Sequence, residues 1–262
     1  MKKYILPLYL IASLMMFVAC DHIDESERLI HVPMQPAKRV VLLEDFTGQQ
    51  CVNCPTGSEV IEQLLEAYPD NVIAVGIHSG PLGFKGNSNN IGLATELGDE
   101  YYYHWDLEYQ PVGLIDRHGA VNYTDWTKEV EEELQKESSL EMDLSATISD
   151  DQIIITVNET ALSAGINGKI QVWLLEDGIT ASQKMPGGSV NKEYVHNHVL
   201  RAAVNGTWGE GCAPKEGETL TQTYSQAIDA AWNTANLSIV AFVYDDSGVL
   251  QAVKTKVAYS LT

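Results

Sequence analysis

Hydrophobic residues follow two different patterns on either side of about residue 138. Between residues 39 and 136, continuous apolar runs alternate with stretches in which apolar residues recur every three or four positions. Continuous runs predict strands buried on both faces, and the wider spacing predicts amphipathic helices. We therefore expect strand, helix, strand and helix over residues 39–46, 55–68, 71–80 and 91–105, then a strand–turn–strand unit over residues 110–123 and a helix over residues 125–136.

The rest of the chain consists of short strand-like runs separated by turn residues such as Asp246-Ser247-Gly248. We expect seven strands, over residues 140–148, 152–158, 169–176, 198–204, 219–225, 237–245 and 249–257. No long amphipathic helix interrupts them, so two packed antiparallel sheets are predicted. The predicted fold class is α/β plus all-β, with an α/β domain over residues 38–138 and a β-sandwich domain over residues 139–262.

Residues 1–20 have the pattern of an export signal. Lys2 and Lys3 precede an apolar stretch from Tyr4 to Val18, which is shorter than the about 20 residues that a membrane-spanning helix needs. The sequence from Phe17 to Cys20 resembles a bacterial lipobox, and this resemblance implies that Cys20 is acylated and becomes the first mature residue. Cleavage as an ordinary secretory signal is the alternative.

Residues 21–37 begin with the acidic run Asp21 to Arg28, which predicts an extended tether. The run also resembles the surface-export signal behind lipid-bearing cysteines in Bacteroidetes, and a plain spacer is the alternative. We expect a protein that lipid alone anchors to a membrane of the cell envelope, and the sequence leaves open whether it faces the cell surface.

The net charge of −20 limits the partners of the chain. So acidic a protein repels the phosphates of nucleic acids and anionic lipid head groups, so neither is an expected direct partner. If Cys20 carries lipid, then Cys51, Cys54 and Cys212 remain in an oxidising compartment. Because their number is odd, at least one thiol is free or pairs transiently.

Cys51 and Cys54 form a Cys-x-x-Cys motif between a predicted buried strand and a predicted helix. Unpaired N–H groups and the dipole at a helix start stabilise a thiolate, and Pro55 fits the first helical turn. Three interpretations stand: a redox-active dithiol, a structural disulfide, or half of a zinc site completed by Cys212 and histidines. We favour the dithiol and expect no cofactor and no metal.

The predicted order of elements, the Asp45-Phe46 pair six residues before Cys51 and the Gln110-Pro111 pair together resemble a thioredoxin-like domain. The resemblance implies that Cys51 attacks a substrate disulfide, that Cys54 resolves the mixed disulfide and that Asp45 accepts the proton of Cys54. It also implies a cis bond at Pro111, against which a substrate peptide docks. Burial of Asp45 would raise its pKa into the range useful for a base.

Two positions depart from the thioredoxin pattern. Gln50 stands where thioredoxins have tryptophan before the first cysteine. Val52-Asn53 replaces the Gly-Pro or Pro-His dipeptide, which sets the reduction potential. We expect Val52, Asn53 and Gln110 to contact the substrate. A Gly- and Asn-rich run over residues 80–90 either covers the site or is a plain surface insertion.

Two groups in the second half carry weaker signals. His196 and His198 would share a face of a strand, which permits metal binding but is more typical of a packed or surface pair. Cys212 lies in a glycine-rich loop. It is either a free thiol, which we favour, or a partner for Cys51 and Cys54.

Four stretches, residues 40–64, 71–80, 194–210 and 237–257, together resemble one protein family. It is the Bacteroidetes lipoprotein family related to the twenty-eight-kilodalton outer-membrane protein. The resemblance implies an outer-membrane lipoprotein with a thioredoxin-like half and a β-rich half. It does not imply a biochemical role.

Two functional hypotheses follow. In the first, the protein is an envelope-tethered thiol–disulfide oxidoreductase that acts on protein or peptide disulfides or thiols and exchanges electrons with an envelope redox partner. In the second, it is a surface binding or adhesion lipoprotein, in which the β-sandwich recognises a ligand and the bond between Cys51 and Cys54 is structural.

Overall fold

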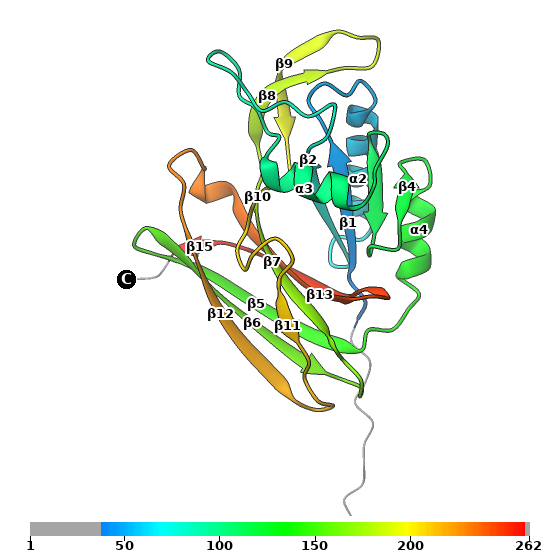
Figure 1. Cartoon of the computed structure of the whole chain (residues 1–262), viewed down its shortest axis with the longest axis vertical. Coiled ribbons are helices and arrows are strands. Elements are labelled where there is room, and N and C mark those ends of the chain that lie inside the picture. The colour runs from blue at the N-terminus through cyan, green and yellow to red at the C-terminus, as the bar shows by residue number, and fades with distance from the viewer. Residues whose placement is uncertain (1–37, 260–262) are drawn as a thin grey trace, which may run out of the picture. The chain divides into compact units, whose positions relative to one another are not determined.

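One mixed β-sheet takes its strands from both halves of the sequence (Figure 1). The computed structural model describes residues 38–259. Within these residues eight strands follow one another in the order β14-β13-β7-β10-β2-β1-β3-β4, and a ninth, β11, pairs with β7. Their bounds are β1 Val41–Thr47, β2 Val72–His78, β3 Val112–Ile115, β4 Ala120–Asn122, β7 Gly168–Glu176, β10 Val199–Ala203, β11 Glu210–Cys212, β13 Leu237–Asp245 and β14 Gly248–Lys256.

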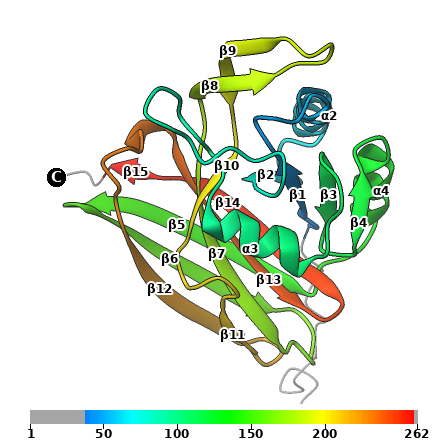
Figure 2. The same cartoon turned by 45° about the horizontal axis from the view of Figure 1, so that its top comes forward.

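Helices cover both faces of the part of the sheet that contains β1, β2 and β3 (Figure 2). On one face lie α2 (Cys54–Ala67) and α4 (Trp126–Glu133), whose apolar residues share a core with those of β1 and β2. Ile61 and Leu64 are the buried members of the predicted α2 stripe. On the other face lies α3 (Glu96–His104), with Tyr101 and Tyr102 in a second core.

The helix predicted over residues 91–105 is wrong over residues 91–95. Here α3 begins only at Glu96, because the hydroxyl oxygen of Thr95 accepts a hydrogen bond of 3.0 Å from Gly98 N and caps the helix. A threonine at this position supplies the acceptor that the first helical turn lacks. The preceding residues therefore stay in the loop that follows β2.

A second sheet packs against the β7–β13 part of the first sheet. It has the order β12-β6-β5-β15, with bounds β5 Leu140–Ser149, β6 Gln152–Ala161, β12 Thr219–Ala227 and β15 Ala258–Tyr259. Alternate residues of β6, such as Ile153, Ile155 and Val157, share a core with Val172 of β7 and Ile239 of β13. All seven strands predicted after residue 139 are present, and β8, β9, β11 and β15 were not predicted.

The large sheet crosses the predicted domain boundary at residue 138. Strand β10 lies parallel to β2, with Val199 opposite Gly76, and Gly76 N donates a hydrogen bond of 2.8 Å to His198 O. The fold is therefore mixed α/β with mostly β structure. The sheet contains strands from both sides of residue 138. The division into two domains at this residue therefore stays a prediction.

A separate hairpin of β8 (Ile179–Lys184) and β9 (Val190–His196) joins β7 to β10. It extends beyond the end of the large sheet, on the side where α2 begins (Figure 1). A segment of the second half thereby reaches the Cys-x-x-Cys motif of the first half.

Candidate functional site

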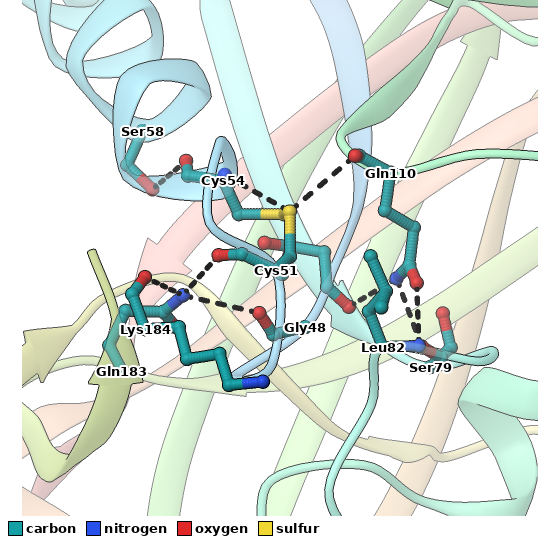
Figure 3. The surroundings of a disulfide bond; sticks show 10 residues. Gly48, Cys51, Cys54, Ser58, Ser79, Leu82, Gln110, Gln183 and Lys184 are labelled. Carbon is teal, nitrogen blue, oxygen red and sulfur yellow. Dashed lines mark hydrogen bonds between the residues drawn. A yellow bond between two sulfur atoms is a disulfide. The ribbon is translucent and has the colours of Figure 1, made fainter. Parts of the chain in front are cut away.

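Cys51 and Cys54 form a disulfide where the loop after β1 enters α2 (Figure 3). The backbone N–H of Cys54 donates to Cys51 Sγ at 3.1 Å, and Pro55 occupies the first turn of the helix. When the bond is reduced, this N–H and the start of the helix stabilise a thiolate on Cys51. The two residues are 1% and 2% exposed, respectively, so the bond is shielded from solvent.

The bond between Gln110 and Pro111 is cis, as the resemblance implied. The Gln110 carbonyl oxygen lies 3.5 Å from Cys51 Sγ, so this peptide group borders the disulfide. The Gln110 side chain points elsewhere: its Nε2 donates to Thr47 O at 2.7 Å and to Ser79 O at 2.9 Å, and its Oε1 accepts from Leu82 N at 3.1 Å. It fastens the loop after β2 to the site, so only its backbone is available to a substrate.

The two residues between the cysteines face outward. Val52 and Asn53 are exposed, and Asn53 is the N-cap residue of α2 without a side-chain cap hydrogen bond. Their position is compatible with the predicted contact to a substrate, which stays a prediction.

Asp45 lies on the same side of the sheet as α2, and it lines a cavity of about 300 Å³ together with Cys54. Its carboxyl group is buried, and burial raises its pKa to about 8. Its Oδ1 has no hydrogen-bond partner within residues 38–259. The neighbouring Glu44 is on the opposite face, where its Oε1 accepts a hydrogen bond of 3.0 Å from Arg117 Nε. Of these two acids, Asp45 therefore belongs to the site.

Two histidines line the same cavity. His78, at the end of β2, and His196, at the end of β9, lie edge to face with their ring centroids 5.1 Å apart. Burial lowers the pKa of His78 well below its ordinary value and that of His196 to about 4, so both rings are neutral at physiological pH. His198 also lines the cavity, but it lies in the bend before β10 with φ of 56° rather than on a strand with His196.

The β8–β9 hairpin holds the loop that carries Cys51 (Figure 3). Gln183 Nε2 donates to Cys51 O at 2.8 Å, and Lys184 N donates to Gln49 O at 2.9 Å. The side chain of Gln49 returns the contact, because its Nε2 donates to Ser182 O at 2.9 Å. Its Oε1 accepts from Leu93 N at 2.8 Å, which ties the loop after β2 to the same point.

The remaining predicted residues lie elsewhere. Cys212 is an unpaired, buried thiol on β11 in the core between the two sheets, and it takes no part in the Cys51–Cys54 bond. In the part of the chain that the structure describes, no group of three or more His, Cys, Asp or Glu side chains is placed to hold a metal ion. Cys20 and the tether over residues 21–37 are outside the described residues.

Sequence reasoning missed Gln49, Gln183, His78 and the hairpin. A signal for the hairpin was present, because Pro186-Gly187-Gly188 is a turn sequence with polar and apolar residues alternating before it. The position of the hairpin over Cys51 had no such signal, since it depends on the sheet in which β10 lies between β7 and β2.

Comparison with known proteins identifies the family. A family model described as outer membrane protein Omp28 matches residues 98–260, which is more than half of the chain. The chain belongs to the Omp28 family. The predicted resemblance to this Bacteroidetes family and the predicted location in the outer-membrane envelope are thereby confirmed. Within residues 38–259, no helix is long and apolar enough to span a bilayer.

Two of the similar solved structures share the fold over most of this chain. HBP35 of Porphyromonas gingivalis is similar at a TM-score of 0.69 and 16% identity, over 85% of this chain and 77% of that one. A protein from Agrobacterium tumefaciens reaches a TM-score of 0.51 and 14% identity, over 83% and 95%. A domain of the outer membrane lipoprotein Omp28 from Porphyromonas gingivalis is 28% identical over 47% of this chain and 92% of that one, at a TM-score of 0.36. Among curated proteins, none matches.

Proposed function

We propose that this Omp28-family protein catalyses thiol–disulfide exchange on protein or peptide substrates of the cell envelope. The observation that carries the proposal is the surroundings of Cys51 Sγ, which has the Cys54 N–H of a helix start at 3.1 Å and the carbonyl oxygen before cis-Pro111 at 3.5 Å. The family match begins at residue 98, so the case for the disulfide rests on this local geometry rather than on the family.

In the reducing direction, the Cys51 thiolate attacks one sulfur of a substrate disulfide. The other substrate sulfur leaves as a thiolate, and the attacked sulfur stays bonded to Cys51 Sγ in a mixed disulfide. Cys54 then loses its proton to Asp45 and attacks Cys51 Sγ, which closes the Cys51–Cys54 bond and releases the attacked substrate sulfur as a thiolate. Two electrons pass from the protein to the substrate, and oxidation of a substrate dithiol is the same sequence reversed.

Asp45 suits the role of proton acceptor because of where it lies. It shares a cavity with Cys54 but has no ion-pair partner among the described residues, so it is free to exchange a proton. Burial raises its pKa to about 8, close to that of a thiol. A carboxylate with an ordinary pKa would be a much weaker base toward Cys54.

Two structural assignments belong to the same proposal. We assign residues 38–138 as a thioredoxin-like unit, supported by the order β1-α2-β2-α3-β3-β4-α4 and by cis-Pro111. We assign Cys20 as the lipid-bearing residue, supported by the lipobox-like sequence before it. Replacement of Cys20 by alanine should move the protein from the membrane fraction to the soluble fraction, and retention of the variant in membranes would refute the assignment.

The test of the function is the reduction potential of the Cys51–Cys54 pair, measured by thiol trapping and mass spectrometry in graded dithiol buffers. A potential between about −270 and about −120 mV, with exchange activity that Cys51→Ser abolishes, is the expected result. A potential below about −300 mV, or activity that survives Cys51→Ser, would refute the proposal.

A second function is favoured by the burial of the disulfide. Both cysteines are almost fully shielded from solvent, and Gln183 of the hairpin holds the loop that carries Cys51 by a hydrogen bond to the Cys51 carbonyl oxygen. In this alternative the bond is structural and the protein is a surface binding lipoprotein whose β-sandwich recognises the ligand. The same potential separates the two functions, because a structural disulfide resists reduction.

A further inference from the structure

A second hollow lies away from the disulfide, on the face of the large sheet that α3 covers. Its volume is about 520 Å³, within the range of about 300–1,000 Å³ that is usual for small-molecule sites. Five segments from both halves of the chain meet there: the end of α3, the β3–β4 turn, the start of β7, the loop before β11 and the β13–β14 turn. They contribute His104, Trp105, Arg117, Lys169, Trp208 and Tyr244.

Arg117 forms the buried end of this hollow. Its side chain is 2% exposed, and its Nε and Nη2 lie 3.0 and 2.9 Å from the same oxygen of Glu44. The guanidinium carbon lies 4.3 Å from the ring centroid of Tyr244 and 4.7 Å from that of Phe242. In the described part of the chain Nη1 and Nη2 have no hydrogen-bond partner, and neither does the second carboxylate oxygen of Glu44.

A third donor is also unmatched. Trp105 Nε1 is buried without a hydrogen-bond partner in residues 38–259, and the Trp105 ring centroid lies 5.8 Å from the Arg117 guanidinium carbon. An unmatched buried donor is energetically unfavourable, so native proteins rarely keep several of them together without a ligand or water. Among the described residues at this end, three unmatched N–H donor groups outnumber one unmatched acceptor, Glu44 Oε2, so a ligand that satisfies the excess donors must present acceptors.

The walls of the hollow are aromatic and held in place. Trp208 stacks on His104 with ring centroids 4.1 Å apart, and its own N–H donates to Glu100 at 3.2 Å. Tyr244 donates its hydroxyl hydrogen to Trp208 O at 2.8 Å. These rings present apolar faces, while the N–H of Trp208 and the hydroxyl of Tyr244 are already paired. A flat, apolar ring is the group that fits between such walls.

The charges at the lip disfavour a ligand with more than one negative charge. Lys169 is exposed there, beside Asp245 and Asp246. The Asp245 carboxylate already accepts from the backbone N–H of Ser247 at 2.8 Å and from its hydroxyl at 2.6 Å. One cation beside two acids, in a protein of net charge −20, tolerates a single negative charge better than two.

We infer that this hollow binds a small aromatic monocarboxylate, with its carboxylate toward Arg117 and Trp105 and its ring between Trp208 and Tyr244. A guanidinium group suits this task because its planar donors match the two oxygens of a carboxylate. The site is separate from the proposed redox chemistry and does not require it. Binding should therefore be the same before and after reduction of the disulfide.

The test is isothermal titration calorimetry of the whole protein with indole-3-acetate and with the neutral indole-3-acetamide. We expect the acetate to bind with a dissociation constant below about 1 mM and at least about tenfold more tightly than the amide. Equal affinities for the two compounds, or no saturable heat up to about 10 mM acetate, would overturn the inference.

Variants locate the site. Arg117→Lys keeps the charge but loses the planar fork, and it should weaken acetate binding at least about tenfold without affecting the amide. Lys169→Gln should weaken acetate binding about twofold to fivefold. Lys192→Gln, exposed on β9 away from the hollow, is the matched control and should bind as the wild type does. If Arg117→Lys fails to fold, the Lys169 and Lys192 variants decide: equal weakening in both, or none in either, overturns the inference.

Discussion

The protonation of Asp45 makes the stability of the oxidised protein depend on pH. Its pKa is about 8 in the folded protein and near the ordinary value of 3.8 in the unfolded chain. Between these values the folded protein binds a proton that the unfolded chain has released, so the free energy of unfolding falls as the pH rises. Each pH unit costs about 1.4 kcal/mol, and the two units from about pH 5 to about pH 7 cost about 2–3 kcal/mol.

Replacement of Asp45 by asparagine removes this titration and keeps the shape of the side chain. The free energy of unfolding of oxidised wild type and of Asp45→Asn would be measured by urea denaturation at about pH 5 and about pH 7. The stability of the variant minus that of the wild type should rise by about 2–3 kcal/mol between these pH values, whatever its sign at the lower pH. Subtraction removes the contributions of other acids, such as Asp116 and Glu159, whose pKa values burial also raises.

The matched control is Asp70→Asn, because Asp70 is exposed in the turn before β2. Its difference from the wild type should be the same at both pH values. The reasoning is refuted if the difference for Asp45→Asn is also constant, since the pKa of Asp45 would then not be raised in the folded protein, as the proposed proton transfer from Cys54 requires.

Three further predictions concern the surroundings of the site and the core. Gln183→Ala leaves the buried Cys51 carbonyl without its 2.8 Å donor. It should lower the free energy of unfolding by about 1–3 kcal/mol and speed reduction of the disulfide by dithiothreitol, whereas the exposed Gln152→Ala should do neither. Gly48→Ala places a Cβ 2.3 Å from Leu82 O, and it should lower the melting temperature by an amount that corresponds to about 1–3 kcal/mol. Gly211→Ala, which meets nothing within 4 Å, should leave the melting temperature unchanged, and equal melting temperatures for the two variants would contradict the contact. Cys212 has its pKa raised to about 12 by burial and by Glu159, so iodoacetamide at about pH 8 should alkylate it only after denaturation. Mass spectrometry of native and unfolded protein checks this, and rapid labelling of the native protein would contradict it.

Local patterns in the sequence predicted most elements of the fold. A strand that is buried on both faces, such as β1, has a continuous run of apolar residues. A helix that is buried along one stripe, such as α2 with Ile61 and Leu64, has apolar residues three or four positions apart. Both patterns can be recognised without knowing which distant residues the element contacts. The seven strands after residue 139 were found for the same reason. The start of α3 was missed because one side chain, Thr95, decides it.

The site was predictable only where it is local in sequence. Cys51 and Cys54 were placed by their spacing at the start of a predicted helix, and Asp45 and Pro111 by the resemblance to a thioredoxin-like domain. The contacts of Gln183 with Cys51 and of His196 with His78 were not predictable, because Gln183 and His196 belong to a hairpin more than a hundred positions later in the chain. A pairing of this kind is set by the topology of the sheet, and a single sequence carries no periodic signal for it.

The pairing of β10 with β2 has a consequence for how the protein is made. A chain that is exported from its N-terminus presents β1, β2 and the Cys-x-x-Cys motif long before Val199 arrives to cover the open edge of β2. During that interval the edge is exposed to pairing with other chains, and the thiols of Cys51 and Cys54 are open to oxidants, which convert them to the disulfide. The β8–β9 hairpin, whose strands precede β10 in the chain, closes over the bond near the end of the same process. The first oxidation of the cysteines is therefore fastest during export, before the second half of the protein folds against the site.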